Sequence, residues 1–489
     1  MKSAHVICGK DNVAVALRDL TAGETAAEVC LAENIPAGHK FARCAIKAGD
    51  PVIKYGESVG RATEDIPAGA HVHSHNLKSG LGGPGEYVWQ PRATELPAAD
   101  MPGFMGYRRK DGRVGIRNEV WIIPTVGCVN AIARTVESRC AHMAVGSVER
   151  IVAYNHPYGC SQLSEDHEMT RRFLCALINH PNAGAVLVLG LGCENNHIAG
   201  MQEQLGAWDP DRVAFLNCQD TEDELLAAET IMERLCAHAA SAKREPCAAS
   251  DLVIGLKCGG SDGFSGISAN PLLGRLSDRI IAAGGSAILT EVPEMFGAEH
   301  LLMARCRNAE TFRDTVEMIN SFKSYFMRYG EGVDENPSPG NKAGGITTLE
   351  EKALGCTQKG GTAPVADVLA YADAVRRPGL SLLYAPGNDL VASCALAAGG
   401  AQMVLFTTGR GTPFGCPVPT VKISSNTPLY EKKRRWIDFD AGPLLSGADP
   451  ECMAESFAEY ILSVASGRET LSEELPKTDL AIFKDGVTL

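Results

Sequence analysis

The sequence predicts an α/β protein with a small N-terminal all-β domain, and three observations support this class. The first 90 residues contain only short apolar runs separated by turn signals. From about residue 106, longer apolar runs end in glycine and alternate with helical segments, as parallel strands covered on both faces do. The 489 residues also exceed what one hydrophobic core usually organises, so two or three domains are expected.

Residues 1–90 are expected to form the all-β domain. Its turns include two similar copies, Ile35-Pro36-Ala37-Gly38 and Ile66-Pro67-Ala68-Gly69. The Gly/Pro-rich residues 91–105 are expected to be a linker. The predicted strands are short and cover residues 4–7, 12–16, 45–46, 51–53, 58–62 and 71–75.

The body is expected to contain two Rossmann-like α/β units with mostly parallel sheets, residues 106–245 and 246–489. Strands are predicted in VWIIPTVGC, IVAYNHPYGC, AVLVLGLGC, LVIGLKCGG, SAILTEVPE, LSLLYAPGND and MVLFTTGRG. A charged helical segment at 220–247 separates the two units. The polar end of each run falls at the carboxyl end of a strand, where ligands bind in open α/β sheets.

Composition and charge limit the partners. A formal charge of −13 disfavours nucleic acid and anionic membranes, and a carboxylate substrate would need local cations. No apolar run reaches transmembrane length, and the N-terminus lacks the apolar region of a signal peptide, so a cytoplasmic location is expected. Seventeen cysteines, an odd number, then indicate reduced thiols rather than disulfides.

Four cysteines follow predicted strands at equivalent points, and a fifth lies in a Gly-rich loop. One interpretation is a small apolar residue where strand, turn and helix crowd together. The other is a set of soft ligands for iron, either one Fe(II) ion or a cluster. No C-x2-C spacing occurs, which excludes a zinc ribbon or a ferredoxin pattern. The five residues are Cys128, Cys160, Cys193, Cys258 and Cys356.

Three histidines, His71, His73 and His75, alternate along a predicted strand and should point to one face. A solvated strand face is one interpretation. Because imidazole binds metals and accepts protons near neutral pH, we favour a position at the active site, with the small domain docked on the body. His156 follows a strand in NHPYGC and is an acid/base candidate, with a packing role as the alternative.

Two strand ends carry groups suited to an anion. Lys257, Ser261 and Asp262 surround a Gly-Gly turn whose backbone amides can bind a carboxylate or phosphate. Arg410 follows Thr408 among glycines, and Arg suits two-point binding of a carboxylate. No Walker A loop or dinucleotide fingerprint follows a strand. Asn341 and Lys359 lie in polar loops, which could also be plain linkers. Glu291 and Glu294 in TEVPE are candidates for holding a metal or moving a proton, with solvated side chains as the alternative.

Several strings taken together resemble the altronate/galactarate dehydratase family. They include GYRRKDGRVGIRN, NHPYGCSQ, KCGGSDGFSGISANP, NPSPGNKAGG, EKALGCTQKGGTAP and FTTGRGTPFG. The N-terminal domain resembles the SAF (β-clip) domain of that family. Its VHSHN segment resembles the altronate branch more than the galactarate branch.

The resemblance implies a carbon–oxygen lyase of carbohydrate catabolism that removes water from a sugar acid. D-Altronate, a hexuronate-degradation intermediate, would give 2-keto-3-deoxy-D-gluconate with help from Fe(II); Mn(II) or an iron–sulfur cluster are the alternatives. Metal ligands would come from His73, His75, Cys128, Cys160, Cys193, Cys258 and Cys356. Acid/base residues would be His156, Lys257 and Lys359. Substrate would be bound by Arg410, Ser261, Asp262, Asn341 and Thr408.

Other functions remain open at this stage. The chain could instead be a galactarate dehydratase or a sulfolactate sulfo-lyase, since both resemble this dehydratase family. Sulfo-lyases, however, carry the small domain and the α/β body on separate chains. A regulator that binds a sugar acid without turning it over is an alternative from a different class. The oligomeric state is also open, with a symmetric homodimer as the common case.

Overall fold

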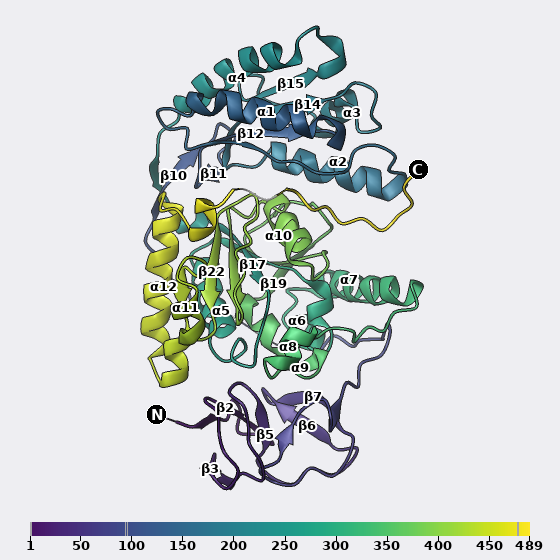
Figure 1. Cartoon of the computed structure of the whole chain (residues 1–489), viewed down its shortest axis with the longest axis vertical. Helices are drawn as coiled ribbons and strands as arrows, with labels where there is room; N and C mark the ends of the chain where they lie inside the picture. The colour runs from purple at the N-terminus through teal and green to yellow at the C-terminus, as the bar shows by residue number, and fades with distance from the viewer. Residues whose placement is uncertain (1, 93, 95, 477–478) are drawn as a thin grey trace.

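The computed structural model describes residues 1–489 except 1, 93, 95 and 477–478. Figure 1 shows a strand-rich unit at the N-terminal end, a large sheet with helices in the middle, and a smaller sheet with helices at the other end. This is the predicted class, an all-β unit followed by α/β units with parallel sheets. In the described part of the chain, no helix is long and apolar enough to cross a membrane.

The N-terminal unit consists of short antiparallel strands. One sheet has the order β1 (Ala4–His5), β2 (Val13–Ala16), β5 (Lys40–Ala42), β8 (His71–Val72). A second has the order β6 (Pro51–Lys54), β7 (Glu57–Ala62), β9 (Leu77–Lys78), and β3 (Thr25–Ala26) pairs with β4 (Val29–Cys30). The strand predicted at 45–46 is instead an isolated bridge between Ile46 and Ile66.

The strand predicted over 71–75 is wrong beyond Val72. The His73 carbonyl accepts hydrogen bonds from the amides of Asn76 and Leu77, and the His73 amide donates to Asn76 Oδ1 at 2.9 Å. These local hydrogen bonds close a turn that competes with the strand. The histidines therefore do not share a face through strand alternation.

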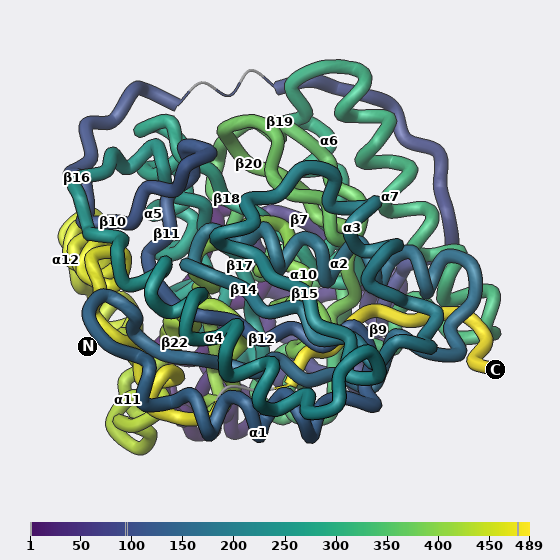
Figure 2. The backbone as a smooth tube through the Cα atoms, turned by 90° about the horizontal axis from the view of Figure 1, so that it is seen from above, coloured from purple at the N-terminus to yellow at the C-terminus, as the bar shows by residue number. Residues whose placement is uncertain are grey.

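Residues 79–103, within the described part, contain no helix or strand and pass along the outside of the molecule beside α7 (Ala309–Arg328) (Figure 2). Tyr87 donates to Glu299 at 2.8 Å, and the Arg92 amide donates to the Ala304 carbonyl at 2.8 Å. The segment is therefore attached to the body along its length. It leads into a small antiparallel sheet of β11 (Val114–Gly115), β10 (Phe104–Arg108) and β16 (Glu245–Cys247).

The middle unit is built on a seven-stranded parallel sheet. Its order is β19 (Val365–Leu369), β20 (Gly379–Leu383), β18 (Ser286–Leu289), β17 (Val253–Cys258), β21 (Met403–Thr408), β22 (Thr420–Ser424), β23 (Phe439–Asp440). The chain proceeds from β17 to β18 on one side and later returns to β21 on the other, so the winding reverses at β17. Helices α5 (Ala269–Ala282), α7, α10 (Asp389–Ala398) and α12 (Pro450–Ala465) flank the sheet (Figure 1).

Shorter helices connect this sheet to the N-terminal unit. They are α6 (Glu299–Met303), α8 (Pro339–Ala343), α9 (Leu349–Cys356) and α11 (Thr427–Lys432).

The third unit has a four-stranded parallel sheet of order β13 (Ile151–Ala153), β12 (Glu119–Pro124), β14 (Ala183–Gly190), β15 (Val213–Asn217). Its helices are α1 (Asn130–Cys140), α2 (Ser164–Ile178), α3 (Ile198–Leu205) and α4 (Glu224–Ala240). Strands β12 and β14 are buried throughout, which is why they read as continuous apolar runs. The C-terminal residues cross between this unit and the middle one (Figure 1).

The N-terminal unit docks on α9 through a buried carboxylate. Lys40 and Lys54 each bind Glu351 at 2.7 Å, and all three side chains are almost completely buried. Burial alone would raise the pKa of Glu351, but the two lysines lower it to about 2. Since two cations share one carboxylate, burial dominates at Lys40 and lowers its pKa to about 8. The contact is therefore a charge network that needs all its members.

Replacing Glu351 with Gln keeps the shape but leaves two buried ammonium groups without a counter-charge. We expect the free energy of unfolding to fall by about 3–5 kcal/mol, measured by urea denaturation followed by circular dichroism. Asp65→Asn is the control, because its pair with Lys47 is solvent-exposed and should contribute nothing measurable. Equal stability of the two variants would contradict this role of Glu351.

Candidate active site

The carboxyl edge of the seven-stranded sheet gathers polar groups where the winding reverses. Lys257 and Cys258 end β17, and Glu291 follows β18 ahead of the 3-10 turn Val292–Met295. Thr408 ends β21 and is followed by Gly409 and Arg410. A reversal point of this kind leaves a crevice outside the strand ends, which is where open α/β sheets bind ligands.

Two thiols and a carboxylate meet in this crevice. The sulfur atoms of Cys258 and Cys356 are 3.3 Å apart, and Glu294 Oε2 lies 3.4 Å from the first and 3.2 Å from the second. All three residues are buried, and their ligand atoms lie within 4.8 Å of one another. Cys356 arrives as the last residue of α9, so the group joins three distant parts of the sequence.

Three lysines surround these groups. Lys359 Nζ lies 2.8 Å from Cys258 Sγ and 2.9 Å from Glu291 Oε2. Lys257 also binds Glu291, and it lies 2.9 Å from Asp389. Lys352 binds Glu294 at 2.8 Å.

The charges within this buried group constrain its protonation. Burial by itself raises the pKa of Glu294, but Lys352, Lys257 and Lys359 outweigh it and lower that pKa to about 2. Burial lowers the pKa of Lys359, but the Cys258 sulfur and Glu291 outweigh it and hold the pKa well above its usual range. The three lysines therefore stay positive and Glu294 stays negative.

The thiols lie within this set of charges. The hydrogen bond with Cys258 and then burial raise the pKa of Cys356 well above its usual value. Three ammonium groups face three carboxylates, those of Glu291, Glu294 and Asp389, so the charges of the set balance. Buried charges are tolerated when they are paired in this way.

The donor set of Cys258, Glu294 and Cys356 fits a metal ion. Two sulfurs and one carboxylate oxygen converge in a buried position, and thiolate ligands favour iron or zinc over magnesium, calcium or manganese. Binding would require both thiols to be deprotonated, so it would release protons.

Beside this centre, the loop after β17 is ordered by Asp262. Its Oδ1 accepts from Ser265 Oγ and Ser425 Oγ, both at 2.9 Å, and its Oδ2 accepts from Asn426 at 3.1 Å. Burial raises the pKa of Asp262, and these hydrogen bonds oppose the rise. Its carboxylate therefore holds the turn and has little capacity left for a ligand.

Of the other polar side chains near this loop, two are already hydrogen-bonded and one has no partner. Asn341 Nδ2 donates to the Ser261 carbonyl at 2.8 Å, and Thr408 Oγ1 accepts from the Gly411 amide at 2.8 Å. The Ser261 hydroxyl is buried and has no hydrogen-bond partner among the described residues. That hydroxyl is the available polar group beside the centre.

A cavity of about 320 Å³ lies between the N-terminal unit and this edge. Ala37 of the N-terminal unit, Asp262 and Gly344 contribute to its wall. Three cations, Arg410, Lys432 and Lys433, also line it. Arg410 donates from Nε and Nη2 to the Gly340 carbonyl at 3.1 and 2.9 Å. The cavity is thus positively charged although the whole chain is acidic.

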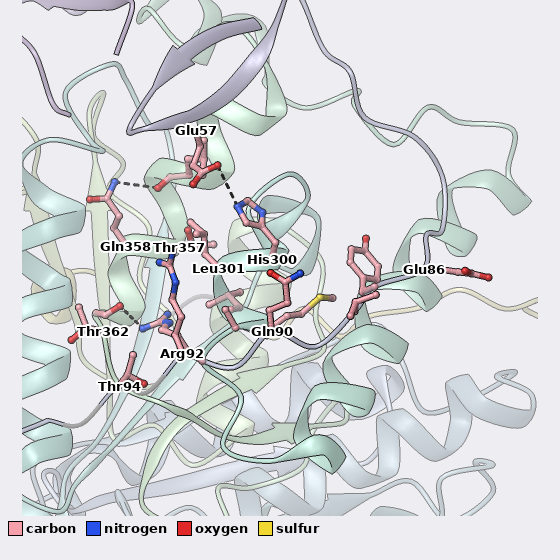
Figure 3. A pocket seen from close by; sticks show the side chains of 18 residues that line it. Glu57, Glu86, Gln90, Arg92, Thr94, His300, Leu301, Thr357, Gln358 and Thr362 are labelled. Atoms are coloured by element: carbon pink, nitrogen blue, oxygen red, sulfur yellow. Dashed lines mark hydrogen bonds and ion pairs between the residues drawn. The ribbon is translucent and has the colours of Figure 1, made fainter. Parts of the chain in front are cut away.

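A larger cavity of about 620 Å³ lies along residues 86–94, against α6 and the 3-10 turn Thr357–Gly360 (Figure 3). Its wall contains an ion pair between His300 and Glu57 at 3.6 Å. Thr357 and Gln358 line it, whereas Cys356 and Lys359 belong to the buried thiol–carboxylate centre. We favour the smaller cavity for an anionic ligand, because it combines cations with the carboxyl ends of β17 and β21.

Four histidines of the N-terminal unit cluster near this smaller cavity. The ring centroids of His39, His71 and His73 are 5.1 to 5.3 Å apart, and that of His75 is 5.6 Å from His71. His73 Nε2 lies 2.9 Å from the carbonyl of Lys342 in α8. Burial and the neighbouring imidazoles lower the pKa of His71 to about 3. The His71 imidazole is therefore uncharged at neutral pH.

His156 and three of the predicted cysteine ligands belong to the other sheet. His156 Nε2 lies 2.7 Å from the Pro124 carbonyl, and its Nδ1 accepts from the Tyr158 amide. Burial lowers its pKa to about 4. Cys128, Cys160 and Cys193 are exposed at the carboxyl edge of the four-stranded sheet.

The two carboxyl edges are separate. Asn182, just before β14, donates to the carbonyl of Gln402, just before β21, so the amino ends of the two sheets meet. The structure thus brings together Lys257, Cys258, Cys356 and Lys359 but not the other three cysteines. His39 and Lys352 were missed from the sequence: His39 stands outside the quoted strings, and nothing within EKALGCTQKGGTAP distinguishes Lys352.

A buried reactive centre at a sheet reversal, beside a cationic cavity, defines an α/β enzyme for a small anion. Comparison with protein families is more specific, and three models match in chain order. They are described as the altronate/galactarate dehydratase SAF domain at residues 2–80, the second domain of D-galactarate dehydratase/altronate hydrolase at 106–240, and the C-terminal D-galactarate/altronate dehydratase domain at 249–488. The chain belongs to the altronate/galactarate dehydratase family, as its sequence strings predicted.

Individual relatives cover the whole chain. It is 52% identical to an altronate dehydratase of Escherichia coli (strain K12), over 98% of each chain. It is also 52% identical to an altronate dehydratase of Bacillus subtilis (strain 168), over the full length of both. Identity to the galactarate dehydratase (L-threo-forming) of Escherichia coli (strain K12) is 33%, over 97% of this chain and 95% of that one.

The low pKa of Glu294 predicts a specific acid sensitivity. Its folded state binds a proton less tightly than the unfolded chain, so the stability it contributes is complete above about pH 4.3 and is lost as pH falls towards about 2. Lys352→Gln removes the main cause of that shift. We expect the variant to lose stability at a higher pH than wild type in acid titrations followed by circular dichroism.

Lys432→Gln, which removes an exposed lysine, is the control and should leave the acid transition in place. Coincident transitions for Lys352→Gln and wild type would mean that Lys352 does not hold Glu294 ionised.

Proposed function

We propose that this protein is a sugar-acid dehydratase that converts D-altronate to 2-keto-3-deoxy-D-gluconate with loss of water. The observation that carries the proposal is 52% identity, along the entire chain, to altronate dehydratases of two bacteria. The lower identity of 33% to a galactarate dehydratase favours altronate over galactarate. The geometry is compatible with this substrate, because Asp262, which lines the cationic cavity, also lines a small cavity together with Cys356 of the thiol–carboxylate centre.

The metal is proposed to be Fe(II), held by Cys258, Cys356 and Glu294. Bound there, it would supply a Lewis acid that stabilises negative charge on the substrate oxygens. Mn(II) is less suited to a site with two thiols. His73 and His75 remain predicted metal ligands. An iron–sulfur cluster, in place of a single Fe(II) ion, also remains a prediction.

The substrate carboxylate is proposed to bind Arg410 in the 320 Å³ cavity. Both Arg410 donors now go to one carbonyl oxygen. A carboxylate accepts them as a charged, two-oxygen partner and is the stronger acceptor. The free Ser261 hydroxyl would meet a substrate hydroxyl, while Asp262, Asn341 and Thr408 hold the surrounding loop.

Dehydration breaks the C–H bond next to the carboxylate and the C–O bond of the adjacent hydroxyl, and the product enol rearranges to the keto acid. Burial lowers the pKa of both His39 and His73, so these imidazoles are uncharged proton acceptors near the cavity. The pKa of Lys257 is held high by Glu291 and Asp389, and that of Lys359 by the Cys258 sulfur and Glu291. We therefore assign the lysines to charge stabilisation and the imidazoles to proton removal, and acid/base roles for Lys257 and Lys359 stay predictions.

His156 remains a predicted acid/base residue, but both of its nitrogens contact backbone groups. We also propose a cytoplasmic location, where the exposed thiols would stay reduced. A homodimer remains a prediction.

Turnover tests the proposal directly. The full chain, purified anaerobically and supplied with Fe(II), should release a 2-keto-3-deoxy acid from D-altronate faster than from galactarate. Sulfolactate should yield no sulfite. Faster turnover of galactarate, or release of sulfite from sulfolactate, would show that D-altronate is not the substrate. Tight binding of D-altronate without product would instead indicate a regulator.

Arg410→Ala should weaken the substrate complex. Loss of a hydrogen-bonded charge pair costs about 1.5–3 kcal/mol, or about ten- to hundredfold in kcat/KM. The kcat/KM of Arg410→Lys should fall between those of wild type and Arg410→Ala, because lysine keeps the charge but not the two-donor geometry.

Arg434→Ala is the matched control, since this exposed arginine stacks on Tyr430 and does not line the cavity. A kcat/KM of Arg410→Ala equal to that of wild type in steady-state kinetics would contradict a role of Arg410 in substrate binding.

A further inference from the structure

Three neighbouring strands of the four-stranded sheet end in the same way. β12, β13 and β14 are each followed by a loop that contains a Gly-Cys pair, ending in Cys128, Cys160 and Cys193. In the sheet order β13-β12-β14 these loops stand side by side at the carboxyl edge. Neighbouring strands are about 4.8 Å apart, so the three loops begin within about 10 Å of one another.

Hydrogen bonds join the loops to one another. The Gly127 amide donates to the Tyr158 carbonyl at 2.9 Å, and the Asn196 amide donates to the Gly159 carbonyl at 3.0 Å. A Cβ atom on Gly159 would lie 2.0 Å from the Thr125 carbonyl oxygen, and φ at Gly159 is +98°. Only glycine permits so close an approach, so the sequence before the cysteine is set by the packing of the loops.

The three cysteines differ from others in the same unit. Cys140, Cys175 and Cys236 are buried in the cores, and burial raises their pKa values to about 11, 12 and 11. Cys218, after β15, packs against the same core and has its pKa raised to about 11 by burial.

Cys128, Cys160 and Cys193 are instead exposed. A free cysteine is usually a buried residue type. The other exposed cysteines of the described chain, Cys30, Cys44 and Cys452, lie on separate elements.

The spacing of the three sulfurs selects the kind of ligand. Among the described residues, the Cys258 group is the only set of three such ligand atoms within 4.8 Å of one another, so the three sulfurs at this edge are farther apart. A single ion with metal–sulfur bonds of about 2.3 Å holds its donors within about 4.6 Å. The three sulfurs are therefore not gathered around one ion, whereas a polynuclear group can bridge thiolates that lie farther apart.

We propose that Cys128, Cys160 and Cys193 bind an iron–sulfur cluster, as a centre separate from the one at Cys258. Thiolates are the ordinary ligands of such clusters, and hydrogen bonds to the sulfurs adjust their potential. Gln219 Nε2 already donates to Cys193 Sγ at 3.5 Å. Two further buried polar atoms, Asn155 Oδ1 and Gln162 Nε2, have no hydrogen-bond partner among the residues described. They are available for hydrogen bonds in the surroundings of the cluster.

Binding needs no electron transfer. Each thiol loses its proton and replaces one small-thiol ligand of a preformed cluster, and that small thiol leaves carrying the proton. With three protein thiolates, an iron that has none remains open to a ligand from solution.

The test uses the full chain, kept anaerobic, and a synthetic iron–sulfur cluster with small-thiol ligands as the probe. After gel filtration, acid-labile sulfide, iron and visible absorption are measured. We expect wild type to retain cluster and the triple variant Cys128→Ser/Cys160→Ser/Cys193→Ser to fall to background. Cys452→Ser, also an exposed cysteine, is the matched control and should retain it, as should Cys258→Ser/Cys356→Ser.

A second readout needs no variant. The bound cluster should protect Cys128, Cys160 and Cys193 from alkylation, detected by mass spectrometry, while Cys452 reacts as before. Wild type without labile sulfide, iron without sulfide, or loss only in the Cys258/Cys356 variant would overturn the proposal. Because these readouts do not depend on turnover, failure of this centre is distinguishable from failure of the proposed dehydration.

Discussion

The eight-residue helix α9 carries the contacts on which the arrangement of the molecule depends. Glu350 accepts from the Gly80 amide at the start of the segment 79–103, and Glu351 binds two lysines of the N-terminal unit. Lys352 binds Glu294, and Cys356 ends the helix inside the thiol–carboxylate centre. A helix this short is marginal by itself, so its position is set by these contacts. Docking of the small unit and assembly of the centre are therefore coupled.

Electrostatics explains why so many charges are tolerated at the centre. Glu291, Glu294 and Asp389 compensate Lys257, Lys352 and Lys359. Loss of any one member leaves an uncompensated buried charge, which costs more than the intact set is worth. The same positive groups suit a reaction that places negative charge on a carboxylate, because they are already oriented before the substrate arrives.

The sequence predicted the α/β class because parallel strands buried on both faces are long apolar runs, as in β14 and β17. It grouped five cysteines, because each follows a strand or lies in a glycine-rich loop. The two predicted units already placed Cys128 and Cys258 in different sheets, but only the structure showed that the carboxyl edges of these sheets lie apart. The histidine strand was wrong since local hydrogen bonds at His73 close a turn. His39 escaped notice because the fold, not sequence proximity, brings it to His71.

We propose that Cys258, Glu294 and Cys356 hold the metal used in dehydration. Crystals of the anaerobic, Fe(II)-loaded protein, measured on both sides of the iron absorption edge, test this assignment most directly. We expect an iron-specific anomalous peak between these three side chains, absent in Cys258→Ser/Cys356→Ser. An active, iron-loaded crystal with no peak there would contradict it.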